Sequence, residues 1–233
     1  MQKRLVRKLD LEIFLSQVKE HPSPSPSLEQ YAVPADVAAT MLYLAAYTNG
    51  DITGKTVIDL GCGTGRLALG AAFLGAKQVV GIDVDKAAIK TAYENAKRAH
   101  LTGKVQWVNG DIGTVHGNFD TVLQNPPFGV QKRGADRSFL QKALEVGNVV
   151  YSLHKGTLKD KALTKKLVFN KTNLVPVTPQ PFLKRFIEEH GGTVKCVHAM
   201  LMTIPHMFSF HTKRKHAFIV DLYVIERKRV RGQ

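Results

Sequence analysis

Short apolar runs and amphipathic stretches alternate over residues 55–153. The short apolar runs predict buried strands at 57–60, 79–82, 105–108, 121–123 and 149–153. The stretches between them repeat their apolar positions at helical spacing, which predicts helices over 67–74, for about fourteen residues from Lys86, and over 137–145. Strands that alternate with helices in this way predict a parallel sheet covered by helices on both faces.

The residues ahead of this region follow other patterns. Residues 3–19 carry apolar side chains at roughly helical spacing, namely Leu5, Leu9, Ile13 and Val18, and predict a helix. Residues 21–27 alternate proline with serine and predict an extended connector. A second helix is expected from Pro34 to the stop signal Asn49-Gly50.

The rear of the chain predicts a different ending to the sheet. Residues 156–180 are rich in lysine and interrupt the alternation. A helix is expected over 181–190, and residues 193–200 and 217–225 can pair as an antiparallel hairpin at one edge of the sheet. We therefore expect a single α/β domain over residues 1–233, with 1–27 as an N-terminal helix and connector. Its sheet is predicted to be doubly wound and mostly parallel, with seven strands that include the C-terminal antiparallel hairpin.

The charge of the chain is divided unevenly. Of 33 Lys+Arg and 19 Asp+Glu, residues 1–131 hold 13 and 12, whereas residues 132–233 hold 20 and 7, so almost all of the net +14 lies in the rear half. Such a surface suits a polyanionic partner. A hydrophobic content of 44% argues against disorder, and no apolar run approaches the roughly 18 residues of a membrane span. With only two cysteines and no signal-peptide pattern, the chain is expected to be soluble and cytosolic.

A glycine-rich turn follows the first predicted strand directly. Residues 59–65 read DLGCGTG, and such glycines let the backbone approach a ligand at the carboxyl edge of the sheet. Asp83 ends the next strand, where a carboxylate can accept hydrogen bonds from both hydroxyls of a ribose. The loop reads Gly-x-Gly-x-Gly and so departs from the dinucleotide pattern Gly-x-Gly-x-x-Gly. Asp111 and Ile112 follow the third strand and are either a further ligand contact or a simple turn.

A second motif, Asn125-Pro126-Pro127-Phe128, ends the fourth predicted strand. The two prolines fix the backbone and leave carbonyl groups without amide donors. The Asn125 amide oxygen and the Pro126 carbonyl can accept both hydrogens of one planar amino group, and Phe128 can stack on the ring that bears it. These residues suit the methylation of an exocyclic amine, whose conjugated lone pair is a poor nucleophile.

From about residue 28 to its end, the chain resembles the methyltransferase-like protein 5 family. These are class I S-adenosylmethionine-dependent enzymes of archaea and eukaryotes that form N6-methyladenosine in small-subunit ribosomal RNA. The resemblance is carried by LEQY at 28–31, DLGCG at 59–63, DVD at 83–85, NPPFG at 125–129, VYSLHK at 150–155 and FH at 210–211.

The resemblance implies a Rossmann-like fold, S-adenosylmethionine as cofactor and roles for individual residues. The catalytic positions are Asn125, Pro126, Pro127 and Phe128. The cofactor-binding positions are Gln30, Asp59, Gly61, Gly63, Thr64, Gly65, Asp83, Asp111 and Ile112. The family usually has threonine where this chain has Val33, and residues 156–180 look like an insertion. Eukaryotic members work with a small zinc-binding activator protein, which is therefore a candidate partner beside structured RNA.

Basic residues follow the proposed catalytic motif and recur at loops expected on the same edge of the sheet. The candidate RNA-binding positions are Lys132, Arg133, Arg137, Lys155, His211, Lys213, Arg214 and Lys215. Contacts of this kind bind backbone phosphates with little sequence information. The cysteines and histidines match no compact zinc pattern, and no metal site is expected.

The residues leave other substrates open. Asn-Pro-Pro-aromatic motifs also serve the methylation of glutamine in proteins and of adenine in DNA. The basic rear half favours nucleic acid over a protein, and the lack of a separate target-recognition domain argues against sequence-specific DNA methylation. A third hypothesis is a non-catalytic RNA-binding factor in ribosome assembly.

Overall fold

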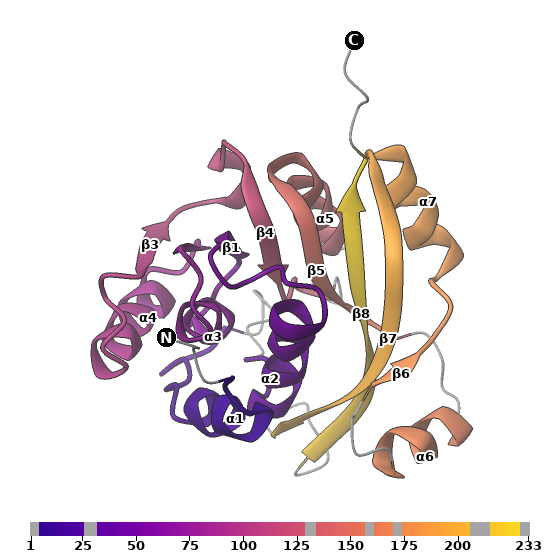
Figure 1. Ribbon diagram of the computed structural model, residues 1–233, viewed down its shortest axis with the longest axis horizontal. Helices are drawn as coiled ribbons and strands as arrows, with labels where there is room; N and C mark the ends of the chain where they lie inside the picture. Colours follow the sequence, from indigo (N-terminus) through magenta and orange to yellow (C-terminus); the bar gives the residue numbers. More distant parts are fainter. Residues whose placement is uncertain are drawn as a thin grey trace.

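The computed structural model describes residues 5–25, 32–128, 134–156, 161–169, 174–205 and 215–228, and its strands form one sheet (Figure 1). The strands are β1 (Thr56–Leu60), β2 (Gln78–Asp83), β3 (Val105–Asn109), β4 (Phe119–Gln124), β5 (Gly147–Lys155), β6 (Val175–Pro176), β7 (Gly192–Pro205) and β8 (Lys215–Arg227). The helices are α1 (Lys8–Ser16), α2 (Ala35–Tyr43), the π-helix η2 (Leu44–Thr48), α3 (Arg66–Phe73), α4 (Lys86–Arg98), the 3-10 helix η3 (Ile112–Thr114), α5 (Ala135–Val146), α6 (Lys161–Phe169) and α7 (Pro181–Glu189).

The strand order is β3-β2-β1-β4-β5-β8-β7-β6. The first five strands in this order run parallel, and β8, β7 and β6 are each antiparallel to the preceding neighbour. The predicted doubly wound parallel sheet with its C-terminal hairpin is confirmed. The predicted number of seven strands is wrong, because the two-residue strand β6 pairs with β7 and makes an eighth.

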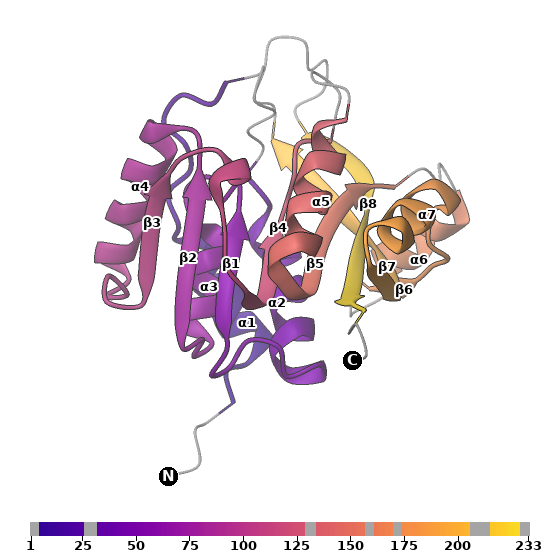
Figure 2. The ribbon, with the colours of Figure 1, turned by 90° about the horizontal axis from the view of Figure 1, so that it is seen from above.

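Helices cover both faces of the sheet (Figure 2). On one face, α1, α2, α3 and the end of α4 pack against the sheet around Leu42, Leu69 and Leu123. On the other face, α5 and α7 pack around Val122, Leu140 and Ile187. Because both faces are covered, the central strands bury apolar side chains on both sides, as Val57, Ile58 and Leu60 of β1 do.

The lysine-rich segment contains an element that the sequence pattern did not indicate. Helix α6 packs on the hairpin through Leu163 and Leu167, which are buried against Ala199 of β7 and Ile219 of β8. The two leucines stand four residues apart, one turn of a helix, but a single pair is too little periodicity to predict a helix among so many lysines. The segment therefore adds a docked helix to the sheet.

The residues that α1 buries are not those whose spacing predicted the helix. The helix that the spacing of Leu5, Leu9, Ile13 and Val18 predicted is present, but Leu5, Leu9 and Ile13 are 71%, 58% and 50% exposed. The buried positions of this segment are Leu11, Leu15 and Val18, which pack in the core with α2 and α3. Two apolar stripes lie on this helix, and the sequence alone does not say which one the fold covers.

Two polar side chains hold the N-terminal segment against the body of the fold. The buried guanidinium of Arg66 donates to the carbonyls of Val33 (2.5 Å) and Val18 (3.2 Å). Asn95, on α4, accepts from the amide of Lys19 and donates to its carbonyl, both at 3.0 Å. The Asn95 amide also donates to the carbonyl of Thr64 at 2.9 Å. One side chain therefore joins the N-terminal segment, α4 and the glycine-rich turn.

We expect Asn95→Ala to lower the free energy of unfolding by about 2 to 4 kcal/mol, because it leaves buried backbone groups without partners. Urea denaturation followed by circular dichroism measures the change. Thr91→Ala on the same helix is the control, since Thr91 bonds only to the helix carbonyl of Ala87 and its loss should cost at most about 0.5 kcal/mol. Equal losses in both variants would contradict a joining role for Asn95.

Candidate functional site

The glycine-rich turn lies between β1 and α3 with its backbone in left-handed conformations. Gly61 and Gly65 have φ of 67° and 88°, which side-chain-bearing residues rarely adopt. A Cβ atom on Gly61 would lie 2.8 Å from the ring of Phe139, and one on Gly65 would collide with the ring of Trp107. The turn therefore needs glycine for its conformation and for the close approach of two aromatic rings.

Asp83 at the end of β2 supports this turn. Its Oδ2 accepts from the amide of Gly63 at 2.8 Å, and its Oδ1 accepts from the amide of Asp85 at 2.9 Å. Burial raises the pKa of Asp83, and these two bonds partly oppose the rise. Each carboxylate oxygen can accept a second hydrogen bond, so the group can hold the turn and still bind a ligand hydroxyl.

Asp59 lies beneath the turn rather than on it. It is 1% exposed, and its Oδ2 accepts from the amide of Ala68 in the first turn of α3 at 3.0 Å. Burial raises its pKa to about 7. From this position Asp59 orients α3 and the turn, while Thr64, also buried, offers its carbonyl to Asn95.

The third predicted contact lies after β3. The side chain of exposed Asp111 caps η3 by accepting from the amide of Gly113 at 2.7 Å, and Ile112 is half-buried. Directly after the neighbouring strand β2, Val84 is 52% exposed. The turn role of Asp111 is thus present, and its other carboxylate oxygen can still accept a hydrogen bond.

The Asn-Pro-Pro-Phe motif leaves the sheet beside the glycine-rich turn. Strands β1 and β4 are parallel neighbours, and Leu60 is in register with Gln124. Gly61 and Asn125 therefore leave adjacent strands at the same level. Pro126 is buried, Asn125 is half-buried with a buried side-chain oxygen, and Phe128 packs edge-on against Phe218 of β8 with ring centroids 5.9 Å apart.

A buried polar network lies behind the motif. Gln124 donates from Nε2 to the hydroxyl of Ser152 at 2.8 Å, and this hydroxyl lies 2.8 Å from Nε2 of His154. All three residues are buried, and His154 packs edge-on against the ring of Tyr223. Within the described part of the chain, Oε1 of Gln124 has no hydrogen-bond partner. Burial lowers the pKa of His154 to about 4, so its ring is neutral at pH 7.

Gln180, at the end of the lysine-rich segment 156–180, lies beside the buried polar network. The amide of Gln180 donates to the hydroxyl of Tyr223 at 2.8 Å. Its side chain donates to the carbonyl of Lys155 at 3.1 Å and to Oδ2 of Asp221 at 3.3 Å. The segment is therefore bound to the end of β5, next to the network that borders the Asn-Pro-Pro-Phe motif.

Only some of the predicted RNA-binding residues lie within the described part of the chain. Arg137 is exposed on α5, and its guanidinium lies 5.8 Å from the ring centroid of Phe182. Lys155 is exposed at the end of β5, and Lys215 begins β8. Outside the described residues lie Lys132, Arg133, His211, Lys213 and Arg214, together with the predicted cofactor residue Gln30.

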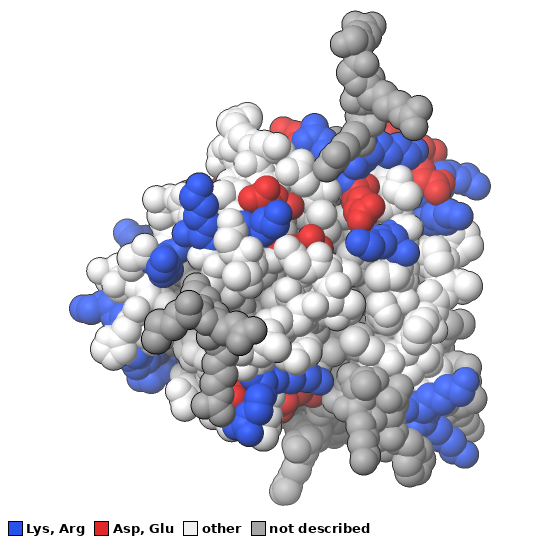
Figure 3. Space-filling view, in the orientation of Figure 1, with Lys and Arg blue, Asp and Glu red and all other residues white. Residues whose placement is uncertain are grey.

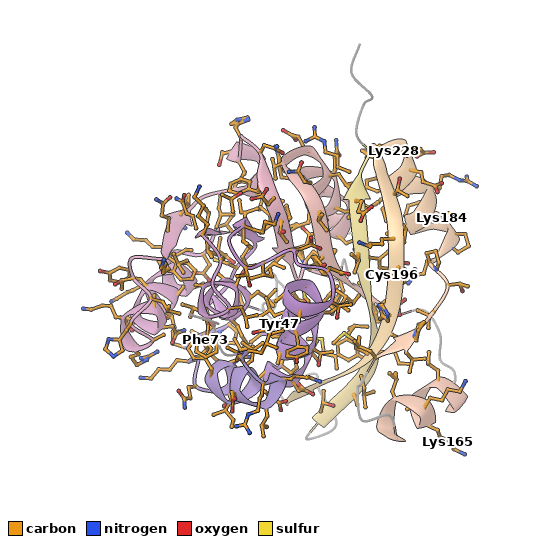
Figure 4. The ribbon with its side chains drawn as sticks, viewed as in Figure 1. Tyr47, Phe73, Lys165, Lys184, Cys196 and Lys228 are labelled. Atoms are coloured by element: carbon orange, nitrogen blue, oxygen red, sulfur yellow. The ribbon has the colours of Figure 1, made fainter. Side chains whose placement is uncertain are left out.

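No three His, Cys, Asp or Glu side chains among the described residues gather closely enough to hold a metal ion. Cys196 and His198 lie two residues apart on β7, and the half-buried thiol of Cys196 is free (Figure 4). Burial raises the pKa of Cys196 and lowers that of His198. Both groups are therefore neutral at pH 7.

Sequence reasoning missed Asn95 and the network of Gln124, Ser152 and His154. Asn95 gives no local signal, because its partners are backbone groups 31 and 76 residues away. A signal did exist for the network. Ser152 and His154 alternate along a strand that is otherwise apolar, so both point to the same buried face, where polar groups need partners.

We expect His154 to make stability depend on pH. In the unfolded chain it takes up a proton near its ordinary pKa of about 6.5, whereas in the fold it stays neutral down to about 4. The contribution of neutral His154 to the free energy of unfolding is therefore complete above pH 6.5. It is lost as the pH falls, and the loss is roughly 2 kcal/mol at pH 5.

Urea denaturation at pH 7.5 and 5.0 tests this, with His154→Phe losing less stability on acidification than the unchanged protein. Since raised carboxyl pKa values such as that of Asp59 act in the opposite direction, the difference between the two proteins is the quantity to compare. The exposed His116→Phe variant is the control. An equal pH dependence of all three proteins would contradict a neutral buried His154.

No helix within the described ranges is both long and apolar enough to cross a bilayer. A family model described as ribosomal protein L11 methyltransferase (PrmA) matches residues 36–126. The chain is 38% identical over 223 residues to the rRNA N(6)-adenosine-methyltransferase Mettl5 of Drosophila melanogaster, covering 93% of this chain and 94% of that protein.

Solved structures agree with this relationship. The crystal structure of a candidate RNA methyltransferase from Pyrococcus horikoshii superimposes with a TM-score of 0.79 at 38% identity, covering 96% of this chain and 99% of that one. Magnesium protoporphyrin IX methyltransferase from Synechocystis, solved with bound SAH, has a TM-score of 0.58 at 17% identity over 82% and 81% of the two chains, a likeness of fold alone. The similarity to the Drosophila enzyme spans both chains nearly from end to end, and the chain belongs to the methyltransferase-like protein 5 family of rRNA N6-adenosine-methyltransferases.

Proposed function

We propose that this protein transfers a methyl group from S-adenosylmethionine to N6 of an adenosine in RNA, most directly in small-subunit ribosomal RNA. The observation that carries the proposal is the register of β1 with β4, which sets the glycine-rich turn beside Asn125. A methyl donor held by the turn and an amine held by the motif then meet at one edge of the sheet.

The residues around the turn fit this cofactor. Asp83 has free acceptor capacity for the ribose hydroxyls, and the bare backbone of the glycines admits a close ligand. Val84 and Ile112 offer apolar surface to an adenine ring, and Asp111 can accept from its amino group. Asp59 and Thr64 act through the turn that they support. Bound there, S-adenosylmethionine supplies an electrophilic methyl group on its sulfonium.

The catalytic motif acts on the amine of the target base. Asn125 Oδ1 and the Pro126 carbonyl accept the two N6 hydrogens, which draws the nitrogen away from conjugation with the ring and stabilises positive charge on it. Phe128 stacks on the base and is itself held by Phe218. Once N6 carries the methyl group and a positive charge, it is acidic enough to pass one proton to water, so the motif supplies orientation and electrostatic stabilisation without a strong base.

The substrate class follows from charge and reach. The rear half carries almost all of the net +14, and exposed Arg137 and Lys155 belong to the elements that follow the catalytic strand. The target adenosine must leave its stack to reach Phe128, which suits a single-stranded or loop region of RNA. Glutamine in a protein, adenine in DNA and a non-catalytic role in ribosome assembly are the alternatives.

The organisation and setting of the protein are part of the proposal. We treat residues 1–233 as one methyltransferase domain with an insertion at 156–180, since all described strands belong to one sheet. Both cysteines are free thiols, as in proteins of the reducing cytoplasm, where we place it. A small zinc-binding activator protein is a further proposed partner, and a rise in Tm on mixing the two proteins would support it.

We expect Asn125→Ala to lower kcat by at least about 100-fold, because one of the two acceptors is lost, while cofactor affinity is unchanged. Labelled S-adenosylmethionine is supplied with ribosomal RNA, transfer RNA, duplex DNA and a release-factor protein in parallel, and products are identified by mass spectrometry. Asn118→Ala, in an exposed loop, is the control. Label in glutamine or DNA, or no label despite cofactor binding, would refute the proposed reaction.

We expect Asp83→Asn to weaken S-adenosylmethionine binding by about 10-fold, the effect of losing one charge-assisted hydrogen bond of roughly 1.4 kcal/mol. Because the amide keeps an oxygen that can accept from Gly63, the turn should persist and kcat at saturating cofactor should change little. Isothermal titration calorimetry and steady-state kinetics measure both quantities. An unchanged dissociation constant would remove Asp83 from the cofactor site.

A further inference from the structure

Helix α6 lies on the sheet at the level of the catalytic motif. Its leucines pack on Ile219 of β8, and the preceding residue of the same strand, Phe218, packs on Phe128. Adjacent residues of a strand point to opposite faces of a sheet. Phe128 and α6 therefore lie on opposite faces at the same height along β8, with the carboxyl edge of the parallel strands between them.

The outer face of α6 is basic. Leu163 and Leu167 are buried, so helix geometry places Lys165 on the opposite side of α6 and Lys166 at its flank, and both lysines are exposed. Figure 4 shows Lys165 at the outer side of this helix. Residues 156–180 hold five lysines and one acidic residue, Asp160. This arrangement leaves the helix with a positive outer surface.

The lysines of α6 differ from three other lysines on the rear half of the chain. Within the described part of the chain, Lys165 and Lys166 form no ion pair. By contrast, Lys142, Lys184 and Lys195 pair with Glu145, Glu188 and Glu226 at 2.8, 4.0 and 2.9 Å. Figure 3 shows blue and red side by side near the C-terminal end of β8, and blue at α6.

Exposed groups lie between the catalytic motif and α6. Lys155 ends β5 and is exposed, and its carbonyl is held by Gln180 at the end of the segment that contains α6. The amide of Gly156 then donates to the carbonyl of Ile219 at 2.9 Å, directly at the α6 contact. Lys155 therefore stands where a strand of RNA would pass from one face of the sheet to the other.

We propose that the outer face of α6, with Lys165 and Lys166, binds the phosphate backbone of the substrate RNA at nucleotides flanking the target adenosine. Unpaired lysines on a docked helix suit evenly spaced phosphates, and they give affinity without reading sequence. The inference deepens the proposed function and rests on it. It gives the insertion the role of a second contact that holds the RNA while the adenosine is at the catalytic motif.

The test compares two double variants that each remove two positive charges. The first double variant, Lys165→Ala with Lys166→Ala, changes α6. The helix should persist, because alanine has the highest helix propensity of all residues. Lys184→Ala with Lys195→Ala is the control, since these lysines are paired with glutamates. The dissociation constant for a ribosomal RNA fragment is measured by fluorescence anisotropy from 50 to 300 mM KCl without S-adenosylmethionine. Circular dichroism checks the fold.

We expect the α6 variant to bind RNA more weakly than the unchanged protein. The slope of the logarithm of the association constant against the logarithm of the salt concentration should become shallower by about 1 to 1.4, because each phosphate contact on single-stranded RNA contributes about 0.7 or less. The control variant should keep the slope, and Lys165→Arg with Lys166→Arg should restore it. A slope equal to that of the unchanged protein, or an equal loss in the control, would overturn the proposal.

Two further outcomes separate this inference from the proposed function. In methylation assays the α6 variant should raise KM for long RNA with kcat and cofactor affinity unchanged, and the effect should vanish on a short RNA without flanking nucleotides. If the unchanged protein methylates no RNA, the proposed function fails, while the salt slopes still decide the α6 contact. Binding of an acidic protein in place of RNA, lost in the same variant, would also overturn the α6 assignment.

Discussion

The pairing of β1 with β4 is the contact on which the rest of the site depends. Parallel neighbours place the ends of their strands at one edge, and the register of Leu60 with Gln124 removes any offset between the two loops. The rings of Phe139 and Trp107 lie close against the glycines of the turn, and the ring of Phe218 packs on that of Phe128. The binding groups can then act from a rigid frame with little reorganisation, which is where electrostatic catalysis gains most.

Much of the fold could be predicted from the sequence, because most elements are determined by residues close together in the chain. The apolar strands, the glycine turn and the Pro-Pro pair depend on neighbouring residues, and their positions matched the structure within a few residues. The choice between the two stripes of α1 could not be predicted, because it is decided by α2 and α3. The docking of α6 likewise depends on Ala199 and Ile219, 32 or more residues further along the chain.

The candidate site shows the same division. Asp83 and Asn125 could be placed from their positions at strand ends, since parallel strands share an edge. The burial of Asp59 beneath the turn could not, because it depends on where α3 lies. The network of Ser152 and His154 was visible only as alternation along β5, and its partner Gln124 becomes evident once β4 and β5 are known to pair.

The bonds of Asn95 also constrain the order of assembly. Its side chain forms hydrogen bonds with both the amide and the carbonyl of Lys19, a residue 76 positions earlier in the chain. During synthesis Lys19 therefore leaves the ribosome well before the side chain that binds its backbone, and contacts between residues far apart in the chain form slowly. A chain that ended before α4 would keep the packing of α1 on α2 and α3 but would leave the backbone groups of Lys19 without the side chain that binds them.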